Sequence, residues 1–166
     1  MTRAANETAR RRQSVADPGA TELDLQRYFP YRLARLAEQV SLAVAEVYAS
    51  RFALSRQEWR ILAVLGARPE LPTKEIGRLT TLDKMHVSRA MQTLEERGIV
   101  RRSRDPDDGR ERIVALTPSG RALYRKIVPY ALEREAALLA ALTAEEVAAM
   151  DVVIDKLAAA ASAATS

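Results

Sequence analysis

Apolar residues recur at three- and four-residue spacing along most of the chain, and this spacing predicts helices. The first segment runs from about Leu23 to Ser50, with Pro30 placed to act in the first turn. A second covers about 56–67, opened by Ser55 and Glu58, which have the spacing of a capping box. The pattern therefore predicts one long and one short amphipathic helix before the middle of the chain.

The middle of the chain holds two further short helical patterns. After Pro72, Thr73 is expected to cap a short third helix, and a fourth is predicted from about Asp83 to Arg97. Gly98 follows the fourth helix, in the position where glycine commonly ends one. Two short helices with a tight connection are typical of a helix-turn-helix.

The hydrophobic period shortens after the fourth helix. Val100–Arg104 and Arg110–Leu116 are predicted as two strands, joined by the turn-forming residues 105–109. A hairpin directly after a helix-turn-helix predicts a winged variant of that motif.

Helical spacing returns in the last third of the chain. Thr117 followed by Pro118 predicts the start of a long helix, and Thr143 with Glu146 is a second capping box, which opens a final helix. The long first helix and the last two are apolar on one face, and a single chain would leave part of that surface exposed. A second copy of the chain is the expected partner.

These elements together predict a mainly α fold with a small β-hairpin wing. The predicted domains are a flexible basic arm at 1–22, a dimerisation helix at 23–54, a winged helix-turn-helix lobe at 55–117 and C-terminal dimerisation helices at 118–162.

Composition narrows the classes of function. The 166 residues include 26 lysines and arginines against 22 aspartates and glutamates, and this excess slightly favours a polyanionic partner. The absence of cysteine excludes disulfides, thiolate metal sites and thiol redox sensing, and the single histidine cannot build a multi-histidine metal centre.

No catalytic or cofactor-binding motif is found, so we expect no enzyme, no cofactor and no metal. No apolar run approaches the roughly 18 residues of a membrane span, so we expect a cytoplasmic protein.

The fourth helix carries the candidate DNA contacts. Its apolar face consists of Val87, Ala90 or Met91, and Leu94. The side chains predicted to point outward are Lys84, Met85, His86, Ser88, Arg89 and Gln92. Arginine and glutamine can read guanine and adenine edges, and the others can contact bases or phosphates. An ordinary solvated helix face is the alternative for this helix taken alone.

The hairpin that follows is rich in arginine. Its strands carry Arg101, Arg102, Arg104, Arg110 and Arg112. Arginine favours bidentate phosphate contacts and insertion into a narrow minor groove. Charge on an exposed hairpin can also serve only to prevent aggregation, which is the alternative interpretation.

Five segments, in this order and spacing, resemble the MarR family of transcriptional regulators. They are Thr73–Leu79, Asp83–Arg89, Leu94–Arg102, Asp105–Arg110 and Leu116–Gly120. With the flanking helices, the resemblance extends over roughly residues 25 to 160.

The resemblance implies a homodimer, formed through the first and last helices, that binds a pseudo-palindromic double-stranded DNA operator. It implies that Met85–Arg89 enter the major groove, that Arg110 enters the minor groove and that Asp108 orients this arginine. Arg102 and Arg112 complete the expected DNA contacts. Met85 and His86 depart from the commonest family pattern, so the family's operators do not transfer to this chain.

Members of the family commonly sense small aromatic anions in a cleft between the dimerisation helices and the DNA-binding lobe. The candidate ligand residues are Tyr28, Tyr31, Arg32, Arg35, Trp59 and Arg60. Aromatic rings can stack on such a ligand, and guanidinium groups can bind its carboxylate. The alternative is that Trp59 belongs to the core and that the arginines face water.

The function expected from the sequence is therefore a ligand-responsive regulator. A repressor released from DNA by a small aromatic acid or its CoA thioester is favoured, although activation remains open. The alternatives are a winged-helix protein-interaction module without sequence-specific DNA binding and, less favoured, an enzyme based on carboxylates, lysine or serine.

Overall fold

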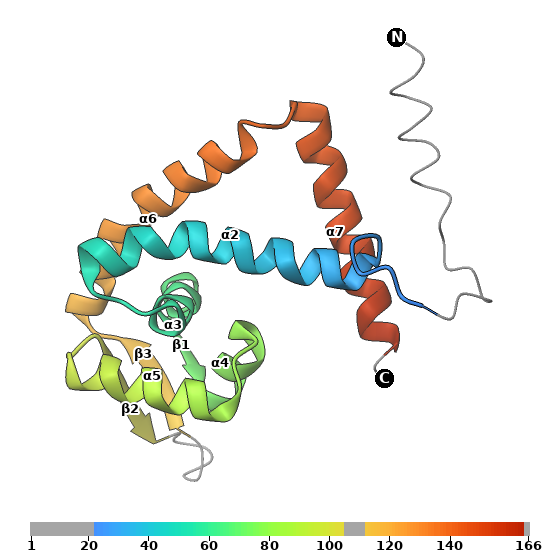
Figure 1. The fold of residues 1–166 in the computed structure, drawn as a ribbon. Coiled ribbons are helices and arrows are strands. Elements are labelled where there is room, and N and C mark those ends of the chain that lie inside the picture. Colours follow the sequence, from blue (N-terminus) through green and yellow to red (C-terminus); the bar gives the residue numbers. More distant parts are fainter. Residues whose placement is uncertain (1–21, 105–111, 165–166) are drawn as a thin grey trace. The chain divides into compact units, whose positions relative to one another are not determined.

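The computed structural model describes residues 22–104 and 112–164 (Figure 1). The expected N-terminal arm up to Thr21 and the wing tip with Asp108 and Arg110 lie outside the described residues. The chain divides into two compact units, Met1–Leu42 and Ala43–Ser166, and each is described by itself.

Helix α2 (Phe29–Phe52) begins in the first unit. It begins later than the apolar pattern from Leu23 predicts, because Asp24 organises a turn ahead of it. The Asp24 carboxylate accepts a hydrogen bond from the Gln26 amide at 3.0 Å, and the Asp24 carbonyl accepts one from the Tyr28 amide at 2.9 Å. Aspartate competes with helix in this way. Pro30 lies in the first turn of α2, as predicted.

The second unit contains the end of α2 and all later elements. The chain leaves α2 through Ala53, whose φ of 49° is left-handed, and enters α3 (Arg56–Ala67). The Ser55 hydroxyl accepts from the Glu58 amide at 3.2 Å, and the Glu58 carboxylate accepts from the Ser55 amide at 2.6 Å. The predicted capping box is confirmed.

Helices α4 (Thr73–Thr80) and α5 (Lys84–Glu96) form the predicted pair of short helices. The expectation that Thr73 caps α4 is wrong, because Thr73 is the first helical residue and Pro72 holds the cap position without a side-chain bond. The Thr73 hydroxyl instead donates to the Arg112 carbonyl at 3.1 Å and so ties α4 to the wing.

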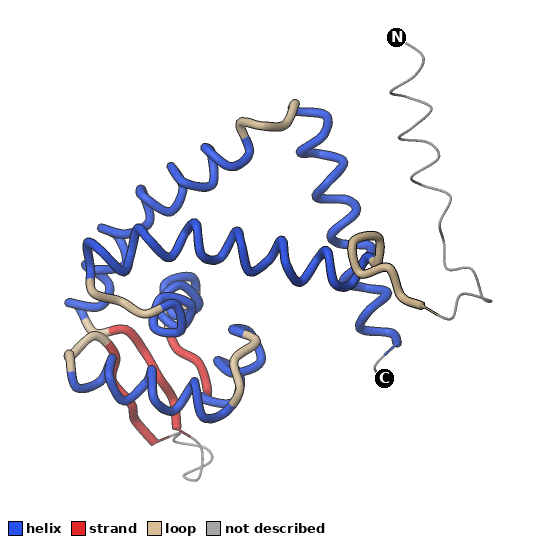
Figure 2. Tube along the Cα trace, viewed as in Figure 1, coloured by secondary structure: helices blue, strands red, loops and turns tan. Residues whose placement is uncertain are grey.

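The wing is part of a three-stranded antiparallel sheet with the order β1-β3-β2 (Figure 2). Strands β2 (Val100–Arg104) and β3 (Arg112–Leu116) form the predicted hairpin. Strand β1 (Glu70–Pro72) was not expected, because the region between α3 and α4 has the sequence of a loop. Pairing of Leu71 with Val114 makes it a strand.

The core of the second unit joins α3, α4, α5, the sheet and α6 (Pro118–Leu139). Its fully buried members include Ile61, Leu62, Leu65, Ile76, Leu94, Val114 and Ile127. At the start of α6, the Thr117 hydroxyl accepts from the Gly120 amide at 3.0 Å, as expected of a cap. A Cβ at Gly120 would lie 2.0 Å from the Ile99 carbonyl oxygen, so only glycine allows this close approach. The start of α6 is thereby fixed against Ile99, which follows α5 and its turn.

The last helix, α7 (Ala144–Ala164), opens with the predicted capping box between Thr143 and Glu146. None of its residues is buried, although it carries an apolar run. Val152, Val153 and Ile154 are each about half exposed. This helix has an apolar surface that the described single chain does not cover.

Candidate DNA interface

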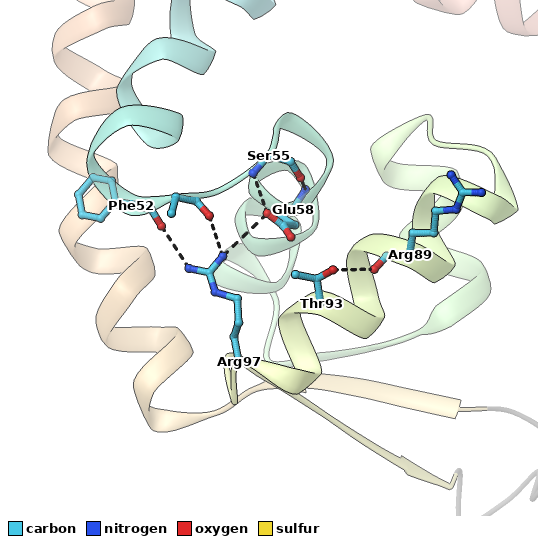
Figure 3. A network of polar contacts seen from close by, with 7 residues as sticks. Phe52, Ser55, Glu58, Arg89, Thr93 and Arg97 are labelled. Carbon is cyan, nitrogen blue, oxygen red and sulfur yellow. Dashed lines mark hydrogen bonds and ion pairs between the residues drawn. The ribbon is translucent and has the colours of Figure 1, made fainter.

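The outward face of α5 is the centre of the candidate interface. The predicted inward residues Val87, Ala90, Met91 and Leu94 are all buried. The six predicted outward residues, Lys84, Met85, His86, Ser88, Arg89 and Gln92, are all exposed. Figure 3 shows the Arg89 side chain projecting from α5 away from the polar contacts around Arg97. The orientation predicted for this helix is confirmed.

Asp83 fixes the beginning of α5. One carboxylate oxygen accepts from the His86 amide at 2.9 Å, and the other lies 2.6 Å from His86 Nδ1. The hydrogen bond from the His86 amide, followed by the bond to the His86 ring, holds the pKa of Asp83 below its ordinary value. Because a carboxylate only accepts, Nδ1 carries the proton of this contact, and Nε2 is left for other partners. The sequence pattern does not indicate that Asp83 belongs to the interface.

Two further residues predicted to contact DNA, Gln92 and Arg102, have partners within the protein. The Gln92 amide donates to Glu96 at 2.9 Å along the helix. Arg102 Nε on β2 lies 2.9 Å from a Glu95 carboxylate oxygen in an ion pair whose geometry is not that of a hydrogen bond. The Arg102 side chain is only 29% exposed. Part of the expected DNA surface is therefore engaged in holding the wing to α5.

A hollow of about 480 Å³ lies between α4, α5 and β2. Its lining includes the apolar residues Leu82, Val87 and Met91 and four cationic residues: Lys74, Arg78, Lys84 and Arg102. Arg78 donates to Glu75 at 2.8 Å, so part of this positive charge is neutralised within α4. The helix-turn-helix face is nevertheless lined with groups that suit a polyanion.

Only part of the predicted wing contacts lies in the described residues. Arg112 is exposed at the first residue of β3, on the side of the hairpin that leads to the tip. Asp108 and Arg110 lie outside the described residues, so their expected contacts stay predictions.

Three of the four candidate ligand residues of the first unit line one hollow. Tyr31, Arg32 and Arg35 line a space of about 440 Å³. The Arg35 guanidinium lies 5.8 Å from the centre of the Tyr31 ring, a cation–π distance. Tyr28 is 43% exposed just before α2 and does not line this hollow.

The two candidates of the second unit, Trp59 and Arg60, lie on α3. Trp59 is half-buried and stacks between Tyr48 at 5.6 Å and Tyr124 at 6.4 Å, measured between ring centres. Burial raises the pKa of Tyr48, and the charges of Arg56 and Arg60 offset part of that rise. Trp59 thus packs against aromatic rings, which fits the core role that was the alternative to ligand binding.

One residue near the interface has a role that the sequence pattern did not indicate. Arg97, at the end of α5, hydrogen-bonds the carbonyls of Phe52 and Ala53 (Figure 3). These partners are 44 and 45 positions away, and no local spacing signals such a contact.

Other kinds of site find no support in the described ranges. Among residues 22–104 and 112–164, no three histidine, aspartate or glutamate side chains are grouped so that they could hold a metal ion. In this same part of the chain, no helix is both long and apolar enough to cross a membrane.

The segment that contains the candidate interface matches a known protein family. A sequence profile of the MarR family matches residues 54–111, which include α3, the helix-turn-helix and the first wing strand. An HTH-type transcriptional repressor of Mycobacterium tuberculosis is 29% identical over 131 residues, covering 78% of this chain and 91% of the relative. The homoprotocatechuate degradative operon repressor of Escherichia coli is 24% identical over 110 residues, covering 66% and 74%.

A solved structure is similar to this chain over most of its length. The PcaV transcriptional regulator from Streptomyces coelicolor, in complex with its natural ligand, matches with a TM-score of 0.70 and 27% identity. The match covers 86% of this chain and 99% of that one. Because MarR-family proteins are DNA-binding regulators and not enzymes, the enzyme alternative falls away. Residues 54–111 match the MarR family of transcriptional regulators, and the chain shares the fold of a solved MarR-family regulator from Silicibacter pomeroyi, with a TM-score of 0.70 and 29% identity.

Proposed function

We propose that this regulator is a repressor that acts in the cytoplasm as a homodimer on a pseudo-palindromic DNA operator. The observation that carries the proposal is the exposed polar face of α5, which lies opposite the buried apolar face of the same helix. The arginine-rich strand β2 follows α5 and is joined to it by the Arg102–Glu95 ion pair. Arg89 reads base edges in the major groove. Arg112 and Arg110, the latter oriented by Asp108, contact the backbone and the minor groove.

The dimer is supported by the uncovered apolar surface of the last helices. Leu132, Leu138 and Leu142 are exposed around the end of α6, and Val152, Val153 and Ile154 on α7. A helix with no buried residue and a run of aliphatic side chains is stable in water only against a partner. A second copy supplies a matching surface by two-fold symmetry, which places two α5 helices on two half-sites.

The effector is proposed to be a small aromatic carboxylate or its CoA thioester. Support comes from the hollow beside Tyr31, Arg32 and Arg35, where a ring and two guanidinium groups lie together. Two relatives add weight: PcaV was solved with its natural ligand, and the homoprotocatechuate repressor controls an operon for degrading an aromatic acid. Ligand contacts by Tyr28, Trp59 and Arg60 stay predictions from the sequence.

DNA binding is tested with a duplex that the wild-type protein enriches from a random-sequence pool. Arg89→Ala is expected to lower the affinity for this duplex by about 1–3 kcal/mol and to relax discrimination at one position per half-site. Arg125→Ala, which removes an exposed arginine from α6, is the matched control. The mass of the protein–DNA complex in ultracentrifugation is expected to correspond to two chains per duplex. Failure to enrich any sequence, with weak binding at low salt, would favour the protein-interaction module instead.

A further inference from the structure

The end of the recognition helix α5 is tied to the end of α2 by a single side chain. Arg97 Nη1 donates to the Ala53 carbonyl at 2.8 Å, and Nη2 donates to the Phe52 carbonyl at 3.1 Å (Figure 3). Phe52 is the last residue of α2, and Ala53 is the left-handed residue that follows it. The two guanidinium nitrogens therefore cap the end of α2, which is expected from the sequence to take part in the dimer together with the last helices.

The physical need for this cap comes from α2. The last carbonyls of a helix have no amide partner within it, and they form the negative end of the helix dipole. A cation placed there satisfies both the hydrogen bonds and the charge. Lysine could supply the charge, but only the planar fork of arginine presents two N–H groups side by side to two adjacent carbonyls.

The start of α3 meets the same guanidinium. Glu58 Oε2, which accepts the Ser55 amide in the capping box, lies 3.9 Å from Arg97 Nη1. The Glu58 side chain is 9% exposed and that of Arg97 33%. At this separation the ion pair is weak beside the two hydrogen bonds to carbonyls, which lie within ordinary bonding distance. The carbonyl contacts are therefore the ones expected to fix the geometry.

We propose that Arg97 is a positioning residue for DNA recognition: by holding the Phe52 and Ala53 carbonyls, it fixes the angle between α5 and the end of α2. The inference rests on the proposed binding to a two-fold operator. Two recognition helices reach two half-sites at once only if each is held at one angle to its own dimerisation helix. Loosening that angle costs specific binding, while contacts to phosphates by other residues persist.

A direct phosphate contact by Arg97 is the competing role, and salt dependence separates the two. Each phosphate contact that is lost lowers the slope of log affinity against log salt by about 1 and weakens binding to every sequence. Loss of a positioning residue lowers affinity for the selected duplex alone and leaves that slope unchanged.

The experiment compares Arg97→Met, Arg97→Lys and Glu58→Gln, with Arg125→Met as the control for loss of one positive charge. Binding is measured by fluorescence anisotropy over a salt series, on the selected duplex and on a scrambled duplex of equal length. Circular dichroism sets a temperature at which every variant is folded. Hydrogen exchange of the amides in 52–55 and 93–97 reports on the contact itself.

Arg97→Met is expected to lose at least about tenfold in affinity for the selected duplex. On the scrambled duplex it is expected to behave like Arg125→Met, with the slope of the wild type and faster exchange in both segments. Arg97→Lys is expected to keep the fold without restoring specific binding, so it carries the test if Arg97→Met does not fold. Glu58→Gln, which keeps the bond to Ser55, is expected to bind within about twofold of the wild type.

Three results would overturn the proposal. Wild-type affinity of Arg97→Met or Arg97→Lys for the selected duplex would remove the positioning role. Equal losses on both duplexes with a reduced slope would make Arg97 a phosphate contact. Failure of the wild type to enrich any sequence would remove the proposed function and this inference together, and that outcome is distinct from the first two.

Discussion

Arg104 on β2 lies directly opposite Arg112 on β3 in the register of the wing hairpin. Side chains on directly opposite positions of antiparallel strands are close neighbours, and like charges there destabilise the pair. Both arginines are exposed, at the end of the hairpin that leads to the tip. In the protein without DNA, these two arginines therefore repel each other. A phosphate group bound between them would reduce that repulsion.

Replacing one member of this pair is expected to stabilise the fold and weaken DNA binding. At low salt, Arg104→Thr should raise the free energy of unfolding by about 0.2–1 kcal/mol, and the gain should shrink at high salt, where repulsion is screened. Arg101→Thr is the matched control, because Arg101 lies opposite Ala115. Denaturant unfolding at two salt concentrations measures the difference, and equal stability of the two variants would contradict the interpretation.

The Asp83–His86 contact predicts a dependence of stability on acid pH. The folded pKa of Asp83 is lowered from 3.8, so its ionised form stabilises the fold above that pH. This contribution is lost as the pH falls through the folded pKa. The stability difference between the wild type and Asp83→Asn is therefore expected to be largest near neutral pH and to disappear in strong acid.

Unfolding curves between about pH 6 and pH 2 measure this difference. Asp155→Asn, at an exposed position on α7, serves as the control. A difference that grows as the pH falls would show that the sign of the argument is wrong.

Two glycines of the lobe should respond in opposite ways to the same substitution. Gly120→Ala would place a Cβ 2.0 Å from the Ile99 carbonyl oxygen, whereas the nearest atom at Gly77, on α4, is 3.7 Å away. We expect Gly120→Ala to cost about 1–3 kcal/mol or more, since backbone must move. Gly77→Ala should be neutral or gain up to about 1 kcal/mol from helix propensity. Thermal unfolding of the two variants side by side is sufficient, and equal losses would refute the argument.

The effector proposal predicts a separation of ligand response from DNA affinity. Arg35→Met and Tyr31→Leu should blunt the release of DNA by an aromatic carboxylate while DNA binding without effector stays within about twofold. Arg27→Met, an exposed arginine outside the residues that line the hollow, is the control. An undiminished response in both test variants would move the ligand site elsewhere without affecting the DNA-binding assignment.

Local signals predicted much of this fold. Capping residues placed the starts of α3, α6 and α7, because a cap needs only residues a few positions apart, such as Ser55 and Glu58. The buried face of α5 could also be predicted, because its apolar residues recur at helical spacing.

Contacts between residues that are far apart in the chain could not be predicted from the sequence. Strand β1 is three residues long, and its only signal is Leu71, whose partner Val114 is 43 positions away in the register. Thr73 has the residue type of a cap, but its hydroxyl bonds the wing instead. Arg97 and Arg102 both look like arginines of a DNA surface, and only the folded arrangement reveals their partners Phe52 and Glu95.

The stack of Tyr48, Trp59 and Tyr124 gives the protein a built-in optical probe. Trp59 is the only tryptophan of the chain, and its two neighbours come from α2 and α6. Energy absorbed by either tyrosine passes readily to an indole at such short range. The tryptophan emission therefore originates from one known point, where three helices meet. A change in the intensity or wavelength of that emission would follow rearrangement of this junction, with no dye attached to the protein.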